Sequence, residues 1–205
     1  SAWDRLAAES ARPDGSARVP LERLATIQGI EPRPKLTMKQ SEGLALTAGY
    51  IGYLIEPDPR ITGRPFEWKD RVALLKAEGT SAAEAKDSKY QAATLMLEIG
   101  MYVASADGEI VPSEVDHVAT FLESRFRLDP TEIRRLEALK GILVEDPPSL
   151  AGVGKRVASL LDDTQREAVG RFLVGVAAAG GTIDAKEVRA LRAAYKALSI
   201  DPTKL

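Results

Sequence analysis

The sequence predicts an all-α protein: a helical bundle built from two similar helical-hairpin units related by a pseudo-twofold axis, with an N-terminal helical extension. Three observations predict this fold class. Residues that favour helices, chiefly Ala, Leu, Glu, Lys and Arg, dominate the 205-residue chain. Several segments begin with a helix-capping pattern, and one helix–turn–helix pattern occurs twice. β-branched residues occur singly and not in alternating runs, so the sequence marks no strand.

Capping patterns indicate where helices begin. Thr37-Met38-Lys39-Gln40 and Ser81-Ala82-Ala83-Glu84 place a hydroxyl at the N-cap and Gln or Glu three residues later, so that each satisfies a backbone N–H of the other. Asp129-Pro130-Thr131-Glu132 adds proline at the first helical position, and Asp184-Ala185-Lys186-Glu187 is a fourth such box. With the helical spacing of apolar residues, these signals predict helices at 20–28, 37–55, 66–77, 82–105, 112–126, 130–143, 152–161, 164–179 and 185–198.

Proline-rich turns divide the chain into two parts. Glu31 to Pro34 and Glu56 to Arg60 carry closely spaced prolines, which interrupt helices. We therefore expect an N-terminal helical extension with Pro-rich loops over residues 1–80, beginning with a lightly ordered arm at 1–18. Residues 81–205 are expected to form a more continuous helical domain.

Composition and charge exclude several classes of function. The chain has 28 Lys and Arg against 30 Asp and Glu, a formal net charge of -2, which argues against a nucleic-acid partner. With no Cys and one His, a thiolate zinc site, a Cys nucleophile and a site with two His are excluded. The longest charge-free apolar stretches, Gly43 to Ile55 and Phe172 to Ile183, are shorter than the roughly 20 residues that span a bilayer. We expect a cytoplasmic protein that does not cross a membrane.

An internal repeat is the strongest signal in the sequence. Ala104 to Val115 reads ASADGEIVPSEV and Ala177 to Val188 reads AAAGGTIDAKEV, with identical residues at six of the twelve positions. After the next helix, Leu128-Asp129-Pro130-Thr131 corresponds to Ile200-Asp201-Pro202-Thr203. Two similar helical hairpins, packed about a pseudo-twofold axis, are therefore expected.

The repeated turns are acidic, and two interpretations of the acidic residues are open. In the first, Gly108 and Gly181 close the incoming helix, while the two equivalent glutamates meet free N–H groups at the start of the next helix. In the second, the turns meet and share a divalent cation, calcium, magnesium or manganese, because hard cations prefer oxygen ligands. A calcium loop of the EF-hand type is not expected, because Val103 stands where its first carboxylate belongs. The candidate ligands are Asp107, Glu109, Glu114, Asp184 and Glu187.

The pattern A-x-ADGEI-x-x-x-EV, followed by a helix and L-D-P, resembles the TerB family of tellurite-resistance proteins over about residues 85–205. The second turn departs from the first, because Gly180 stands at the position of Asp107. The resemblance implies an all-α fold of two similar helical units and no enzymatic activity. Residues 18–60 resemble the region before the TerB unit in longer members, which implies a fragment of a larger multidomain protein.

Three other features have simpler interpretations. The segment Gly152 to Arg156 resembles the end of a phosphate loop but lacks the required Ser or Thr and a preceding strand, so we interpret it as a loop leading into a helix. His117 is expected to be a half-exposed surface residue, with a contribution to a metal site as the alternative. A basic cluster interleaved with glutamates is interpreted as a solvated helix face. Its members are Arg125, Arg127, Arg134, Arg135 and Lys140.

Two functions follow as expectations. The first, which the TerB resemblance implies, is a non-enzymatic protein-interaction module of a bacterial tellurite-resistance or stress-response system, with protein partners that include a membrane-associated complex. The alternative is a divalent-cation binding or sensing domain that uses the acidic residues of the two turns. No nucleophile with an adjacent base is apparent in the sequence, and no other cofactor is indicated.

Overall fold

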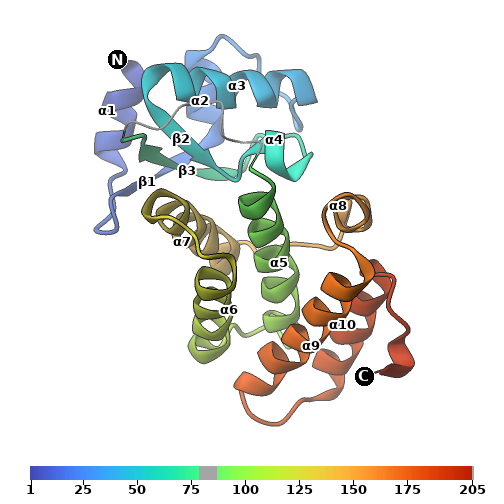
Figure 1. The fold of residues 1–205 in the computed structure, drawn as a ribbon. Coiled ribbons are helices and arrows are strands. Elements are labelled where there is room, and N and C mark those ends of the chain that lie inside the picture. Colours follow the sequence, from blue (N-terminus) through green and yellow to red (C-terminus); the bar gives the residue numbers. More distant parts are fainter. Residues whose placement is uncertain (79–86, 205) are drawn as a thin grey trace. The chain divides into compact units, whose positions relative to one another are not determined.

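The structure, a computed structural model, describes residues 1–78 and 87–204 and divides into two compact units (Figure 1). The first unit comprises Ser1–Asp87 with Glu137–Ile142, and the second comprises Ser88–Leu136 with Leu143–Leu205. Helices dominate the described residues, which confirms the predicted helical class, and one small sheet accompanies them. The expected domain boundary between residues 80 and 81 lies outside the described residues.

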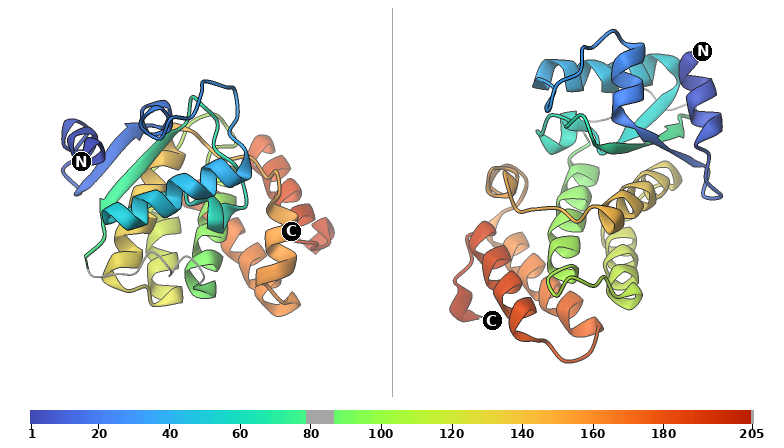
Figure 2. Two further views of the ribbon diagram at one scale, coloured as in Figure 1. Left: turned by 90° about the horizontal axis from the view of Figure 1, so that it is seen from above. Right: turned by 180° about the vertical axis from the view of Figure 1, so that it is seen from behind.

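The first unit is a three-stranded antiparallel sheet with helices packed on it. The strand order is β1-β3-β2, with Val19 opposite Val72 and Ile55 opposite Leu74. Helices α1, α2 and α3 share one core with the face of the sheet that carries Val19 and Leu74 (Figure 2). The elements are α1 (Ala2–Glu9), β1 (Ser16–Pro20), α2 (Leu21–Ile27), α3 (Met38–Ile51), β2 (Tyr53–Glu56), α4 (Pro59–Thr62) and β3 (Arg71–Lys76).

One predicted helix in this unit is wrong and another is too long. The helix expected at 66–77 is replaced by β3, and the helix expected at 37–55 ends at Gly52, whose φ of 91° closes α3 before β2 begins. Both faces of the sheet are buried: Leu74 packs in the core under the helices, while Leu75 packs against residues of α7 (Pro130–Glu145) on the opposite face. A strand buried on both faces is apolar without alternation, so its sequence does not show the period of a strand.

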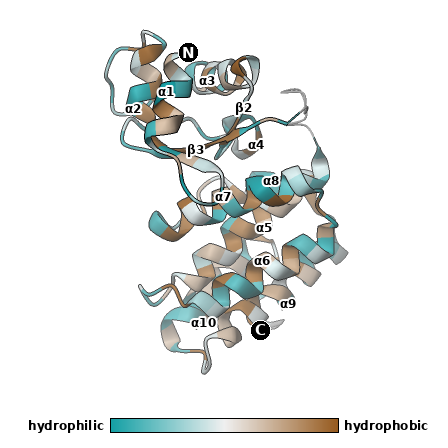
Figure 3. Ribbon diagram, turned by 90° about the vertical axis from the view of Figure 1, so that its left-hand side faces the viewer, coloured by the Kyte–Doolittle hydropathy of each residue, from teal (hydrophilic) through white to brown (hydrophobic). Residues whose placement is uncertain are grey.

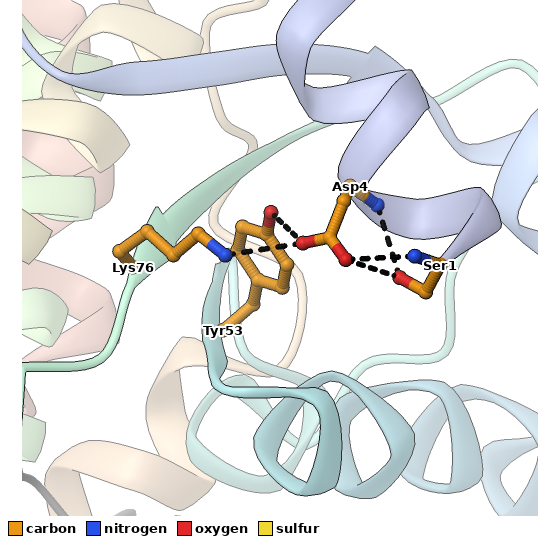
Figure 4. A network of polar contacts seen from close by, with 4 residues as sticks. All are labelled: Ser1, Asp4, Tyr53 and Lys76. Atoms are coloured by element: carbon orange, nitrogen blue, oxygen red, sulfur yellow. Dashed lines mark hydrogen bonds and ion pairs between the residues drawn. The ribbon is translucent and has the colours of Figure 1, made fainter.

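The first 18 residues are also more ordered than expected. They include α1 and the first residues of β1, and Trp3 of α1 is 1% exposed. Figure 4 shows how α1 is attached to the sheet: the Tyr53 hydroxyl donates to Asp4 Oδ1 at 2.7 Å, and Lys76 Nζ donates to the same oxygen at 3.1 Å. The Lys76 ammonium also lies 4.4 Å from the centroid of the Tyr53 ring. The expected lightly ordered arm at 1–18 is therefore wrong.

The second unit is entirely helical in its described part. α5 packs against α6, α8, α9 and α10, and buried residues occur on all its sides. Its sequence is accordingly hydrophobic, as its colouring in Figure 3 shows. The elements are α5 (Ser88–Ala104), α6 (Pro112–Phe126), most of α7, α8 (Val153–Leu160), α9 (Asp163–Ala179), α10 (Ala185–Ala197) and the short 3₁₀ helix η2 (Pro202–Lys204).

Local capping signals located the helix starts well. The reciprocal capping boxes at Thr37, Asp129 and Asp184 are confirmed. A further box, Asp162 with Gln165, begins α9 and was not predicted. The box at Ser81 to Glu84 lies outside the described residues. These boxes are recognisable in sequence because their hydrogen bonds span only three residues.

The two copies of the repeat share their backbone conformation at equivalent positions. Gly108 and Gly181 have φ of 89° and 121°, and the residues that follow the outgoing helices, Arg127 and Ser199, have φ of 48° and 56°. Positive φ is uncommon for Arg and Ser, so its occurrence at both equivalent positions indicates the same chain reversal. Each copy is a helix, a turn and a second helix; the pseudo-twofold axis that would relate the copies stays a prediction.

Candidate functional site

The two repeated turns lie next to each other in the second unit. Ser113 at the start of α6 donates a hydrogen bond through Oγ to the carbonyl of Ala179, the last residue of α9, at 3.4 Å. Gly180, which follows Ala179, faces the side chain of Glu114. The candidate site therefore combines the α5–α6 turn with the α9–α10 turn, two segments far apart in sequence.

Glu114 is the central side chain of this site. It is the third residue of α6 and is only 3% exposed. A Cβ atom on Gly180 would collide with the Glu114 carboxylate, so the absence of a side chain at position 180 makes room for it. No hydrogen bond to this carboxylate occurs among the described residues. Burial, followed by the negative charges of Glu187 and Asp107, raises the pKa of Glu114 to about 7.

Glu187 occupies the equivalent position in the second copy but has a different environment. Its carboxylate accepts from the Asp184 backbone N–H at 2.7 Å, and Asp184 accepts from the Glu187 backbone N–H at 2.8 Å. The predicted capping role is therefore confirmed for Glu187. Val111 stands where the second copy has Asp184, and no side-chain hydrogen bond caps α6. The capping role predicted for Glu114 is consequently not found, because its reciprocal partner is missing.

The remaining predicted ligands lie closer to the surface. Asp107 Oδ1 accepts from the Glu109 backbone N–H at 2.9 Å, which stabilises the first turn, and the Glu109 side chain is exposed. Asp184 is exposed at the start of α10. Glu114, Glu187 and Asp107 are near enough to interact electrostatically. Within residues 1–78 and 87–204, however, no group of three or more His, Cys, Asp or Glu side chains is placed to hold a metal ion.

His117 lies one turn further along α6, in a different environment from the acidic turns. Its ring stacks on Phe172 of α9, with centroids 6.1 Å apart, and Phe172 in turn stacks on Phe121 at 4.3 Å. Gly175 of α9 gives the imidazole room, since a Cβ there would lie 3.2 Å from Nε2. The exposed His117 side chain borders an open cavity of about 680 Å³ beside α6. It is therefore a surface residue, as expected.

The second unit also contains a buried ion pair that the sequence analysis does not predict. The Arg156 guanidinium of α8 contacts the Glu98 carboxylate of α5; Glu98 is 3% exposed. The segment Gly152 to Arg156 is thus the start of a helix, as interpreted, and its arginine has a structural role. In the sequence, the signal for this ion pair is a lone glutamate within the apolar run of α5.

The predicted solvated basic face needs correction at one of its members. Arg135 is only 6% exposed, and its guanidinium lies over the Tyr90 ring, 4.6 Å from the ring centroid.

These features define an all-helical domain with two similar, adjoining acidic turns, one of which encloses a buried glutamate. The chain belongs to the TerB family: the family model described as "Tellurite resistance protein TerB" matches residues 90–205, more than half of the chain. Comparisons with curated proteins and with solved structures give no match. In the part of the chain that the structure describes, no helix combines the length and the apolar character that crossing a membrane requires.

Proposed function

We propose that this TerB-family chain is a protein-interaction module of a bacterial tellurite-resistance or stress-response system and that it acts without catalysing a reaction. In this role it binds protein partners in the cytoplasm, and a membrane-associated complex is among these partners. The observation that carries this proposal is an uncharged, apolar surface on α3 of the first unit, which is suited to contact with another protein.

Two large side chains form this surface. Leu46 is 45% exposed and Tyr50 is 89% exposed, and they lie one turn apart on the same side of α3. The stretch Gly43 to Ile51 contains no charged residue, whereas the solvent side of a surface helix ordinarily carries charges. Burying a fully exposed large apolar side chain contributes roughly 1.5 to 3 kcal/mol, and Leu46, which is already half-buried, contributes less than that. We call Leu46 and Tyr50 the α3 surface.

The double variant Leu46→Glu/Tyr50→Glu is expected to reduce partner recovery at least tenfold. Charged side chains on the α3 surface cannot be buried against a partner without a large desolvation cost. The measurement is affinity capture of the tagged chain from bacterial cells, with captured proteins quantified by mass spectrometry. Circular dichroism melting of each variant checks that the fold is retained.

The matched control is Ile27→Glu, which places a charge on a separate exposed apolar residue of the same unit (40% exposed). Specific partners should be recovered by the wild type and by Ile27→Glu and be lost from the double variant. Equal recovery by all three proteins would show that the α3 surface is not the binding surface.

A second candidate function is divalent-cation binding at the acidic turns. The specific observation in its favour is Glu114, a buried carboxylate beside Asp107 and Glu187, because a cation would offset the repulsion that raises its pKa. The carboxylates do not form a ready coordination sphere in the described residues. Binding would therefore require the side chains of Asp107 and Glu114 to move together.

Native mass spectrometry of chelator-treated protein, titrated with calcium, magnesium and manganese, tests this candidate. We expect a one-to-one adduct that weakens at least tenfold in Asp107→Asn/Glu114→Gln. The control variant Asp163→Asn/Glu167→Gln removes the same charge from α9 and should bind as the wild type does. Without an adduct at millimolar metal, or with equal weakening in both variants, the cation function is rejected.

A further inference from the structure

A cavity of about 390 Å³ lies between α5 and α10, beside the acidic turns and in the unit that does not contain the α3 surface. The last turn of α5 and the residues just after it contribute Tyr102, Ser105 and Ala106, and the first turns of α10 contribute Lys186 and Arg189. Pro148, from the segment before α8, and Ala190 of α10 complete the lining. A space of this size is typical of small-molecule sites and exceeds what a single inorganic ion needs.

The charged side chains that line this cavity are both positive. Lys186 and Arg189 line it, and no carboxylate is among its lining residues. The acidic side chains of the same helix start, Asp184 and Glu187, accept hydrogen bonds from backbone N–H groups at 2.7 to 2.8 Å. Among residues 1–78 and 87–204, neither cation has an ion-pair partner. The first turns of α10 thus place at the cavity two cationic side chains that form no ion pair among the described residues.

The hydrogen-bonding groups of the cavity are mainly donors. The Ser105 hydroxyl donates to the Tyr102 carbonyl at 3.0 Å, so Ser105 can offer a ligand only its lone pairs. Arg189 Nε donates to the Ala185 carbonyl at 3.3 Å, which steadies the guanidinium and leaves its terminal nitrogens for a ligand. The Tyr102 hydroxyl has no hydrogen bond in the described part of the chain. Three side chains that carry donor groups, Tyr102, Lys186 and Arg189, therefore line one space.

The remainder of the wall is apolar. Ala106 and Pro148 offer no polar side-chain group, and the Tyr102 ring adds a flat face. Two cations and a phenol suit a dianion with several acceptor oxygens, for which phosphate is better matched than a single carboxylate. The apolar wall suits an organic group attached to that phosphate. We propose that this cavity binds a phosphate monoester of a small organic molecule.

Phenyl phosphate is a suitable probe, because it combines a dianionic phosphate with a flat apolar ring. Isothermal titration calorimetry of the full chain should show one-to-one binding at millimolar concentration or below, at least fivefold tighter than inorganic phosphate. Phenol, which lacks the phosphate, should not bind measurably. Amide shifts in a ¹⁵N–¹H spectrum should move for residues around 102–106 and 186–190.

Matched variants assign the binding to this cavity. Lys186→Gln/Arg189→Gln should weaken phenyl phosphate binding at least tenfold. Arg192→Gln/Lys196→Gln removes the same charge from exposed positions further along α10 and should change it less than twofold. Tyr102→Phe, which removes only the hydroxyl, should weaken it severalfold. Absence of binding at 10 mM probe would overturn the proposal, and so would equal weakening by both charge variants, which would indicate general surface attraction.

Discussion

Replacing Glu114 by glutamine is expected to raise the free energy of unfolding at pH 8 by up to about 3 kcal/mol. Burial and the charges of Glu187 and Asp107 raise the pKa of this carboxyl from 4.5 to about 7 in the folded protein. Each unit of difference between the folded and unfolded pKa corresponds to about 1.4 kcal/mol. Glutamine has nearly the same shape but does not ionise, so it removes the cost of the buried charge.

Because the pKa of Glu114 is higher in the folded protein, the free energy of unfolding should fall as pH rises. Below about pH 4.5 the carboxyl is protonated in both states and contributes nothing to the dependence. Between about 4.5 and 7 the unfolded chain releases the proton while the folded protein retains it, so stability falls as pH rises. Above about pH 7 the full cost is present. Urea unfolding of chelator-treated protein at pH 5 and pH 8 measures this fall.

The control for this prediction is Glu109→Gln, which removes an exposed carboxylate from the same turn. It should leave both the stability and its pH dependence close to those of the wild type. Glu114→Gln should instead lose much of the fall between pH 5 and pH 8. If its stability followed the wild-type curve in parallel, Glu114 would not be the residue that titrates in this range.

Replacing Arg156 by methionine is expected to lower the free energy of unfolding by about 3 to 5 kcal/mol. The guanidinium contacts Glu98, whose side chain is 3% exposed, in the middle of α5. Removing one member of a buried ion pair leaves the other charge in an environment that solvates it poorly. Thermal and urea unfolding of the full chain, followed by circular dichroism, measure the loss.

Two further variants distinguish a buried pair from a surface contact. Glu98→Gln/Arg156→Met removes both charges and should recover part of the stability lost in Arg156→Met, which keeps the test informative if the single variant folds poorly. Arg23→Met breaks the exposed pair between Arg23 and Glu9, whose side chains are 51% and 58% exposed, and should cost less than about 1 kcal/mol. Equal losses in the two single variants would contradict the structural role of Arg156.

The helical domain was predictable because its signals are local. A capping box joins residues three positions apart, so Asp129 with Glu132 and Asp184 with Glu187 are recognisable in the sequence. The sheet was not predictable in the same way. The apolar run Val72 to Leu75 in β3 has the composition of a buried helix, and only its pairing with β1 and β2 identifies it as a strand.

In the candidate site, too, some features are predictable from the sequence and others depend on the folded chain. The internal repeat alone identifies Glu114 and Glu187 as equivalent residues. Their environments differ for two reasons that depend on the folded chain: Val111 cannot cap α6 as Asp184 caps α10, and the turn that contains Gly180 lies directly against Glu114. The exposure of Tyr50 likewise depends on which side of α3 packs on the sheet.

The helical class, the positions of most helix starts and the duplicated acidic turn follow from the amino-acid sequence, because they depend on interactions between residues close in the chain. Three features follow only from the folded chain: the two turns meet, Glu114 is buried without a hydrogen bond among the described residues, and Arg156 pairs with Glu98. These features depend on contacts between segments far apart in sequence. Burial and electrostatic environment, which set the chemistry of a side chain, arise from such contacts.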